Sequence, residues 1–147
     1  MYMRVTLDTC VLFQALYSSS GASHHILRLL RDGEIEFVIS VPVYEEYRDV
    51  LLRKESLKQF ELDKEDVLKV LDFLVIAGVR IDVQFLMRPN LRDENDNMFV
   101  DLAFASGSRY IITKNIRDFK IDNELEIGSF EVITPSEFMK RWREYHG

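Results

Sequence analysis

Short apolar runs alternate with amphipathic segments along the chain, and this alternation predicts the order of its elements. The runs are rich in β-branched and aromatic residues, as strands tend to be. They cover residues 3–7, 37–39, 79–83, 110–113 and 130–133. Apolar residues recur at helical spacing over residues 11–16, 24–30, 42–53, 67–76, 96–105 and 135–145. The pattern therefore predicts strands that alternate with helices.

Strands that alternate with helices favour an α/β fold, because the parallel strands of such a fold need crossover connections that helices supply. We expect a three-layer α/β/α sandwich with helices on both faces of a parallel sheet. Residues 79–83 alternate between apolar and polar side chains, which indicates a short strand at the sheet edge. Because no repeat or linker interrupts the pattern, residues 1–147 are expected to form a single domain.

Acidic residues recur where the pattern predicts that a strand gives way to a helix or loop. They are Asp8, Glu46, Asp96 and Asp118. In an open α/β sheet, side chains that follow the carboxyl ends of different strands converge on one crevice. Carboxylates gathered there repel one another unless a cation lies between them. The placement therefore predicts a site for a divalent cation.

Helical spacing separates acids that face the core from acids that face solvent. In the helix opened by Ser40 and Pro42, Glu46 borders the apolar stripe and Glu45 projects from the opposite side.

In the later helix, Asp96 is in line with Phe99, whereas Asp101 and Asn97 are predicted to face away. Taken alone, Asp96 is more simply explained as an acid that stabilises the first turn of this helix, with Asp93 as the cap.

The acids nearest the strands also have structural interpretations. Asp8 can cap the helix that follows the first strand, and Asn115 and Asp118 can be turn residues. Independent caps and turns do not need to gather at one edge of a sheet. The joint placement of these residues after predicted strand ends therefore favours a shared site.

Five sequence segments surround these residues in a characteristic order. They read VTLDT at residues 5–9, SVPVYEEY at 40–47, RDEND at 92–96, ITKNIRDF at 112–119 and ITPSEF at 133–138. In order and spacing they resemble the PIN-domain nucleases, a family that includes the toxins of many toxin–antitoxin pairs. The resemblance runs from the first predicted strand to the last predicted helix. It implies a five-stranded sheet in strand order 3-2-1-4-5.

The same resemblance implies cleavage of RNA with magnesium or manganese. Thr113 matches the family hydroxyl that orients the first acid, and Lys114 and Arg117 are assigned to substrate binding. The catalytic residues implied are Asp8, Glu46, Asp96, Asn115 and Asp118.

Magnesium and manganese prefer oxygen ligands, which agrees with the residue types. We assign Asp8, Asp96 and Asp118 as metal ligands, and Glu46 to hold a metal-bound water or to act as a base. The predicted protein is a metal-dependent endoribonuclease and the toxin of a toxin–antitoxin pair. The resemblance also implies an antitoxin partner and a homodimer.

Cys10 departs from the family pattern, because many members have Asn or Ser two residues after the first acid. A thiol is a weaker hydrogen-bond partner, so the departure bears on how well Asp8 is positioned. One rival prediction makes Cys10 a nucleophile with a histidine base. A second is a PIN-like module that binds RNA or protein without cleaving it. A third is a carboxylate-rich phosphatase, which the lack of an acid two residues after Asp8 disfavours.

Composition narrows the class of protein. A net charge of −6 disfavours a sequence-indifferent wrapper of nucleic acid. With a single cysteine no internal disulfide can form, so a cytoplasmic location is expected. We expect no secretory signal and no membrane association, because no segment approaches the roughly twenty apolar residues that a membrane-spanning helix needs.

Overall fold

A computed structural model describes residues 3–84, 97–119 and 130–146. Five strands form a parallel sheet in the order β3-β2-β1-β4-β5, which confirms the predicted topology. The strands are β1 (Met3–Leu7), β2 (Ile35–Ile39), β3 (Val79–Arg80), β4 (Tyr110–Ile112) and β5 (Glu131–Ile133). The helices of these ranges are α1 (Thr9–Tyr17), α2 (Ala22–Arg31), α3 (Val41–Leu51), α4 (Lys54–Phe60), α5 (Lys64–Ala77), α6 (Asn97–Ser106), the 3-10 helix η2 (Ile116–Phe119) and α7 (Pro135–His146).

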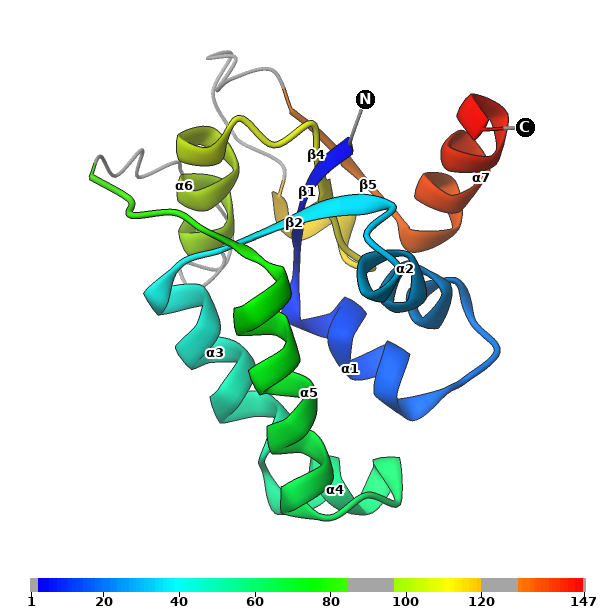
Figure 1. Ribbon diagram of the computed structural model, residues 1–147, viewed down its shortest axis with the longest axis vertical. Helices are drawn as coiled ribbons and strands as arrows, with labels where there is room; N and C mark the ends of the chain where they lie inside the picture. The colour runs from blue at the N-terminus through cyan, green and yellow to red at the C-terminus, as the bar shows by residue number, and fades with distance from the viewer. Residues whose placement is uncertain (1–2, 85–96, 120–129, 147) are drawn as a thin grey trace.

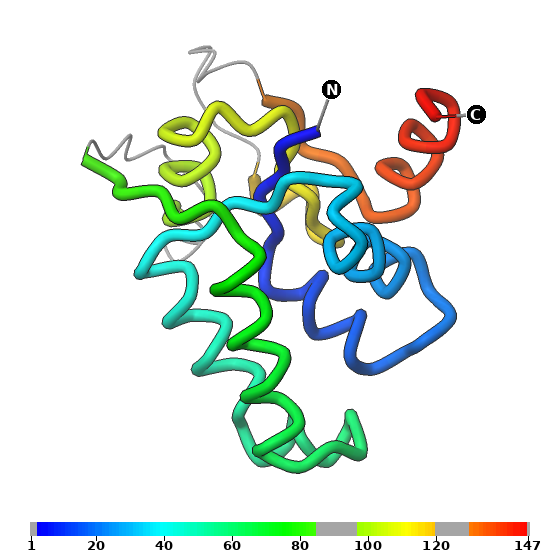
Figure 2. Tube along the Cα trace, in the orientation of Figure 1, coloured from blue at the N-terminus to red at the C-terminus, as the bar shows by residue number. Residues whose placement is uncertain are grey.

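Helices cover both faces of the sheet (Figure 1). Helix α6 packs against β1, β2 and β4 on one side, and α2 packs against β2 and α7 on the other. Helices α3 and α5 run side by side, and α4 connects them at the end remote from the sheet (Figure 2). The arrangement is the α/β/α sandwich expected from the alternation of strands and helices. None of the helices in the described ranges has the length and apolar character needed to cross a membrane.

The strand registers place the carboxyl ends of β1 and β4 next to each other. Leu7 pairs with Ile112, and the amide of Asp8 donates to the Ile112 carbonyl at 3.0 Å. The amide of Thr113 donates in the same way to Ile133 of β5, also at 3.0 Å. Backbone pairing therefore continues one residue beyond each strand, so the positions of Asp8 and Thr113 are fixed by the sheet.

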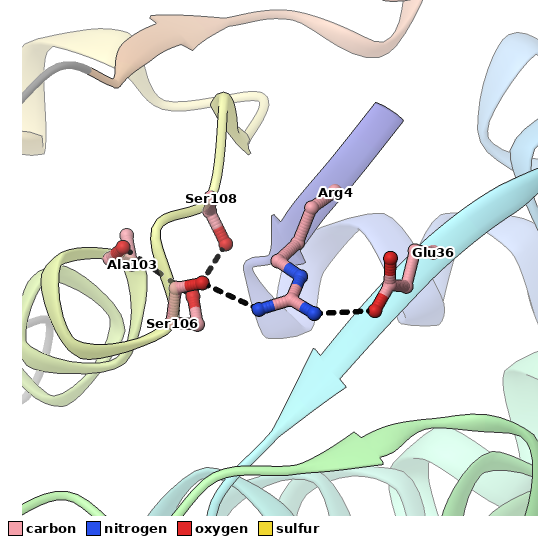
Figure 3. Close-up of polar contacts among 5 residues, drawn as sticks. All are labelled: Arg4, Glu36, Ala103, Ser106 and Ser108. Atoms are coloured by element: carbon pink, nitrogen blue, oxygen red, sulfur yellow. Dashed lines mark hydrogen bonds and ion pairs between the residues drawn. The ribbon is translucent and has the colours of Figure 1, made fainter. Parts of the chain in front are cut away.

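A polar network joins β1 and β2 to the residues at and just after the end of α6 (Figure 3). We call it the Ser108 network. The Ser108 hydroxyl bonds the hydroxyls of Thr6 at 2.9 Å and Ser106 at 2.8 Å. The Arg4 guanidinium donates to the Ser106 carbonyl at 2.6 Å and pairs with Glu36. The three hydroxyl residues are buried, and a buried hydroxyl without a partner costs about 1–3 kcal/mol. The network therefore anchors the end of α6 to β1.

Two helices were not predicted from the sequence. Helix α4 buries only Ser56 and Phe60, and so it lacks the long apolar stripe that periodicity detects. Phe60 packs against Phe13 of α1 with ring centroids 4.7 Å apart, a contact between distant parts of the chain. The 3-10 helix η2 is only four residues long and buries Phe119 alone.

Candidate active site

Asp8 lies directly after β1 and is only 7% exposed. It occupies the position before the first turn of α1, yet its side chain makes no capping hydrogen bond there. Its Oδ2 atom instead accepts hydrogen bonds from the Thr113 hydroxyl at 2.6 Å and from the Cys10 thiol at 3.3 Å. The carboxylate is therefore oriented by two side chains, Cys10 in α1 and Thr113 after β4, and not by a capping hydrogen bond at the start of α1.

Burial raises the pKa of the Asp8 carboxyl above its ordinary value, because desolvation disfavours the charged form. The hydrogen bonds from Thr113 and Cys10 lower this pKa, and the negative charge of Asp118 raises it. Desolvation is the largest of these effects. A cation next to Asp8 would favour the ionised form, so the electrostatics of the site suit a bound metal.

Thr113 connects Asp8 to the turn that follows β4. Its side chain is 0% exposed. The Thr113 hydroxyl accepts a hydrogen bond from the Asn115 amide at 3.0 Å and donates one to Asp8. The Asp118 amide then donates to the Asn115 carbonyl at 3.0 Å, and buried Phe119 anchors η2. Asn115 is exposed and Asp118 is half-buried. We call Asp8, Cys10, Thr113, Asn115 and Asp118 the Asp8 site.

Cys10 is half-buried and contacts three groups of this region. Besides Asp8, its sulfur lies 3.6 Å from the Thr113 hydroxyl and 3.4 Å from the amide nitrogen of Lys114, which donates to it. Burial and the charge of Asp8 raise the pKa of the thiol to about 12. A thiol with this pKa stays protonated at neutral pH, which disfavours the prediction of a cysteine nucleophile.

Helix α3 brings Glu46 toward the end of the first strand. Its start is capped by Ser40, whose hydroxyl accepts from the Val43 amide at 3.4 Å. Glu46 is half-buried and Glu45 is exposed, as the helical spacing predicts. The hydroxyl of Tyr47, the next residue, donates to the carbonyl of Leu7 beside Asp8. Complete burial raises the pKa of Tyr47 well above its ordinary value, so the hydroxyl keeps its proton.

Asp96 lies outside the described residues, so its assignment as a metal ligand stays a prediction. Within the described ranges, no three His, Cys, Asp or Glu side chains gather closely enough to hold a metal ion. Asp8 and Asp118 are close enough for the charge of one to affect the pKa of the other. A metal held there would need a further ligand or water molecules, as magnesium commonly uses.

The prediction for Asn97 and Asp101 was wrong, because both side chains are buried, with 8% and 5% exposure. Helix α6 packs against the sheet and α3, and its five consecutive residues from 99 to 103 are all buried, whereas Phe104 and Ala105 are exposed. The apolar run from 98 to 105 is the sequence signal for such a largely buried helix. Asp101 lines a cavity of about 370 Å³ together with Ser40 and Pro42, at the start of α3.

Two cations lie beside the Asp8 site. Lys114 and Arg117 are exposed, and the Lys114 ammonium donates to the side-chain oxygen of Gln14 at 3.2 Å. This bond joins the loop after β4 to α1.

Comparisons with known proteins agree with this architecture. The family profile of the PIN domain matches residues 4–117, which is most of the chain. Among solved structures, the chain is similar to one in the crystal structure of VapBC2 from Rickettsia felis bound to a DNA fragment from their promoter. The identity is 20%, the TM-score is 0.58, and the match covers 90% of this chain and 98% of that chain. No curated protein sequence matches significantly.

Proposed function

This chain belongs to the PIN-domain family, and we propose that it is a metal-dependent endoribonuclease that hydrolyses RNA phosphodiester bonds. The observation that carries the proposal is the buried Asp8 carboxylate, oriented by Thr113 where β1 and β4 end. This arrangement lowers the stability of the fold, because burial opposes the ionised form of Asp8. A structural aspartate would be expected to cap α1 instead, and Asp8 does not.

Magnesium or manganese would be held by Asp8 and Asp118, with Asp96 as a third ligand. When bound, such an ion supplies activation of a water molecule and stabilisation of charge on a phosphate. Thr113 keeps the Asp8 carboxylate in one orientation through the bond to Oδ2. Glu46 holds a water molecule or accepts its proton, and Asn115 orients the water or the phosphate.

Lys114 and Arg117 supply the positive charge that an RNA backbone needs beside an acidic site. Both are exposed and lie in the segment after β4, which begins with Thr113. Because the overall charge is −6, favourable contacts with RNA phosphates are confined to the surface near these two cations, which favours a short segment of RNA over an extended duplex.

We further propose that the enzyme is the toxin of a toxin–antitoxin pair. The structure that it resembles is a VapBC complex, and this likeness in fold supports an antitoxin as the protein partner. A homodimer is proposed from the same family resemblance, and a cytoplasmic location from the single cysteine, which allows no internal disulfide.

Cleavage of labelled RNA by the purified chain, with Mg²⁺, Mn²⁺ or EDTA, tests the activity. We expect cleavage with either metal, none with EDTA, and a loss of about 100-fold or more in Asp8→Asn and Asp96→Asn. Glu46→Gln should lose most of the activity, whereas Glu45→Gln, the same change at the neighbouring exposed residue, should keep it. Equal activity of these two glutamine variants would contradict the assignment of Glu46.

The second candidate is a PIN-like module that binds RNA or protein without cleaving it. Two features favour it: Asn115 is neutral, and Cys10 is a weaker hydrogen-bond partner for Asp8 than the Asn or Ser of many family members. Retained RNA binding with no cleavage under any of the metal conditions would support this module. Cleavage that disappears in Asp8→Asn would exclude it.

A further inference from the structure

Four buried aromatic rings form a continuous row through the elements around the candidate active site. The rings of Phe37 in β2 and Tyr47 in α3 have centroids 6.3 Å apart. Tyr47 lies 6.3 Å from Phe99 of α6, and Phe99 lies 6.4 Å from Phe119 of η2. Aromatic pairs at such distances stabilise the packing of the elements that carry them. The row therefore joins β2, α3, α6 and η2 into one packed unit.

Two of these rings are sequence neighbours of proposed site residues. Tyr47 directly follows Glu46, and Phe119 directly follows Asp118. Both rings are buried, with 0% and 5% exposure. Because protein interiors are densely packed, each ring restrains the backbone that carries the adjacent carboxylate.

The Tyr47 hydroxyl extends this row to the first strand. It donates to the carbonyl oxygen of Leu7, the residue immediately before Asp8. Since Tyr47 is completely buried, water does not compete for this bond. The bond thus connects the backbone next to Glu46 with the backbone next to Asp8, across two different elements.

We propose that Tyr47 is a positioning residue whose hydroxyl fixes Asp8 relative to Glu46 and thereby sets the affinity of the site for a divalent metal. The inference rests on the proposed function in taking Asp8 as a metal ligand. A tyrosine with only a packing role would affect stability and leave metal affinity unchanged.

The test is titration of the full chain with Mn²⁺ alone, by calorimetry and by electron paramagnetic resonance of the free ion. Tyr47→Phe should keep the fold and bind Mn²⁺ about tenfold more weakly, the lower end of the range found for partners that orient metal ligands. Tyr110→Phe is the matched control. Tyr110 is 2% exposed, packs against Phe138 with centroids 5.8 Å apart, and lies at the start of β4, away from the Asp8 site. Its affinity for Mn²⁺ should equal that of the wild type.

Phe99→Leu separates the hydroxyl from the packing of the row. It removes a ring and keeps the Tyr47 hydroxyl, so its loss of Mn²⁺ affinity should be smaller than that of Tyr47→Phe. An equal or larger loss in Phe99→Leu would assign the effect to packing and overturn the proposal. If Tyr47→Phe is partly unfolded, the titrations are repeated in trimethylamine oxide, which favours the compact state. Failure to fold there also overturns the proposal, because the role of Tyr47 would then be structural.

RNA cleavage, measured separately, distinguishes this inference from the proposed function. A chain that binds Mn²⁺ more weakly in Tyr47→Phe but cleaves no RNA supports the inference and contradicts the nuclease. A chain that cleaves RNA while Tyr47→Phe keeps wild-type Mn²⁺ affinity overturns the inference alone. A wild-type chain that binds no Mn²⁺ overturns the inference together with the metal assignment.

Discussion

The Ser108 network and the Asp8 site lie in the same sheet but differ in how their buried polar groups are paired. In the Ser108 network, the Ser108 hydroxyl bonds two neighbouring hydroxyls, and Arg4 faces Glu36. In the Asp8 site, a buried carboxylate has Thr113 and Cys10 as partners but also faces the negative charge of Asp118. The first region satisfies its polar groups internally. The second leaves two carboxylates close enough to repel each other, which is where we propose that a metal ion binds.

The contrast separates residues that stabilise the fold from residues that lower its stability and that we propose to take part in cleavage. A satisfied buried hydrogen bond contributes about 0.5–1.5 kcal/mol, whereas a buried carboxylate near a like charge reduces stability. Mutations in the Ser108 network should therefore affect unfolding, and mutations in the Asp8 site should affect cleavage. The strongest test is a mutation that raises the free energy of unfolding and lowers cleavage.

Asp8→Asn should lower cleavage by about 100-fold to 1000-fold, because several kcal/mol of transition-state stabilisation by the metal depend on this ligand. It should also raise stability in EDTA at neutral pH. The pKa of Asp8 is higher in the folded state than its unfolded value of 3.8, so protonation favours folding and ionisation opposes it. The stability that the proton contributes is lost as the pH rises through the folded-state pKa.

Urea unfolding of the wild type and Asp8→Asn between pH 4 and pH 8 measures this difference. The free energy of unfolding of the variant should increase relative to that of the wild type as the pH rises, since asparagine carries no charge at any of these pH values. A variant less stable than the wild type at pH 7 would show that Asp8 is a stabilising residue and would remove the contrast between the two regions.

Thr113→Val should have the next largest effect, a loss of about 10-fold to 100-fold in metal affinity or cleavage. Valine has nearly the shape of threonine but cannot donate the 2.6 Å hydrogen bond to Asp8. Calorimetric titration with Mn²⁺ measures the affinity, and Thr134→Val provides a control at the hydroxyl that caps α7 through a 3.1 Å bond from the Glu137 amide. Unchanged Mn²⁺ affinity in Thr113→Val would leave Thr113 without a role in orienting Asp8.

The sequence predicted the strands well because each has a compact β-branched or aromatic pattern. Residues 3–7 were predicted as a strand and form β1, and the other strands begin or end within a few residues of their predicted limits. The separation of Glu45 from Glu46 was also predictable, because α3 buries a single stripe. In these segments local pattern and tertiary environment agree.

The environment of α6 could not be predicted by the same rule. Asp101 and Asn97 were assigned to a solvent face, but both are buried, and within α6 only Phe104 and Ala105 in the last turns are exposed. The hydrogen bond from Thr113 to Asp8 was expected from the family resemblance alone, and that from Tyr47 to Leu7 was not expected, because each joins residues far apart in the sequence. Periodicity shows which side of an element is apolar, but it does not show which hydroxyl will meet which oxygen once the elements pack.

Ser108→Ala tests the opposite side of the comparison. The change removes the hydroxyl that both Thr6 and Ser106 bond, and it should lower the free energy of unfolding by about 1–2 kcal/mol. Urea unfolding measures the loss, and cleavage per folded molecule should stay at the wild-type level. A fall in cleavage per folded molecule would show that the anchor of α6 to β1 also controls the geometry of the Asp8 site.

Cys10→Ser should have the smallest effect and sharpens what the thiol does within the Asp8 site. A serine hydroxyl is a stronger donor than a thiol, so it should hold Asp8 more firmly and change metal affinity or cleavage by a few-fold, about 0.5–1 kcal/mol. Because the hydrogen bond favours ionised Asp8, the increase in cleavage should be largest on the acidic side of the pH profile. Cys10→Ala, which removes the donor, should move the profile in the opposite direction. Identical pH profiles for the two variants would show that the 3.3 Å contact between the thiol and Asp8 is packing without influence on the carboxylate.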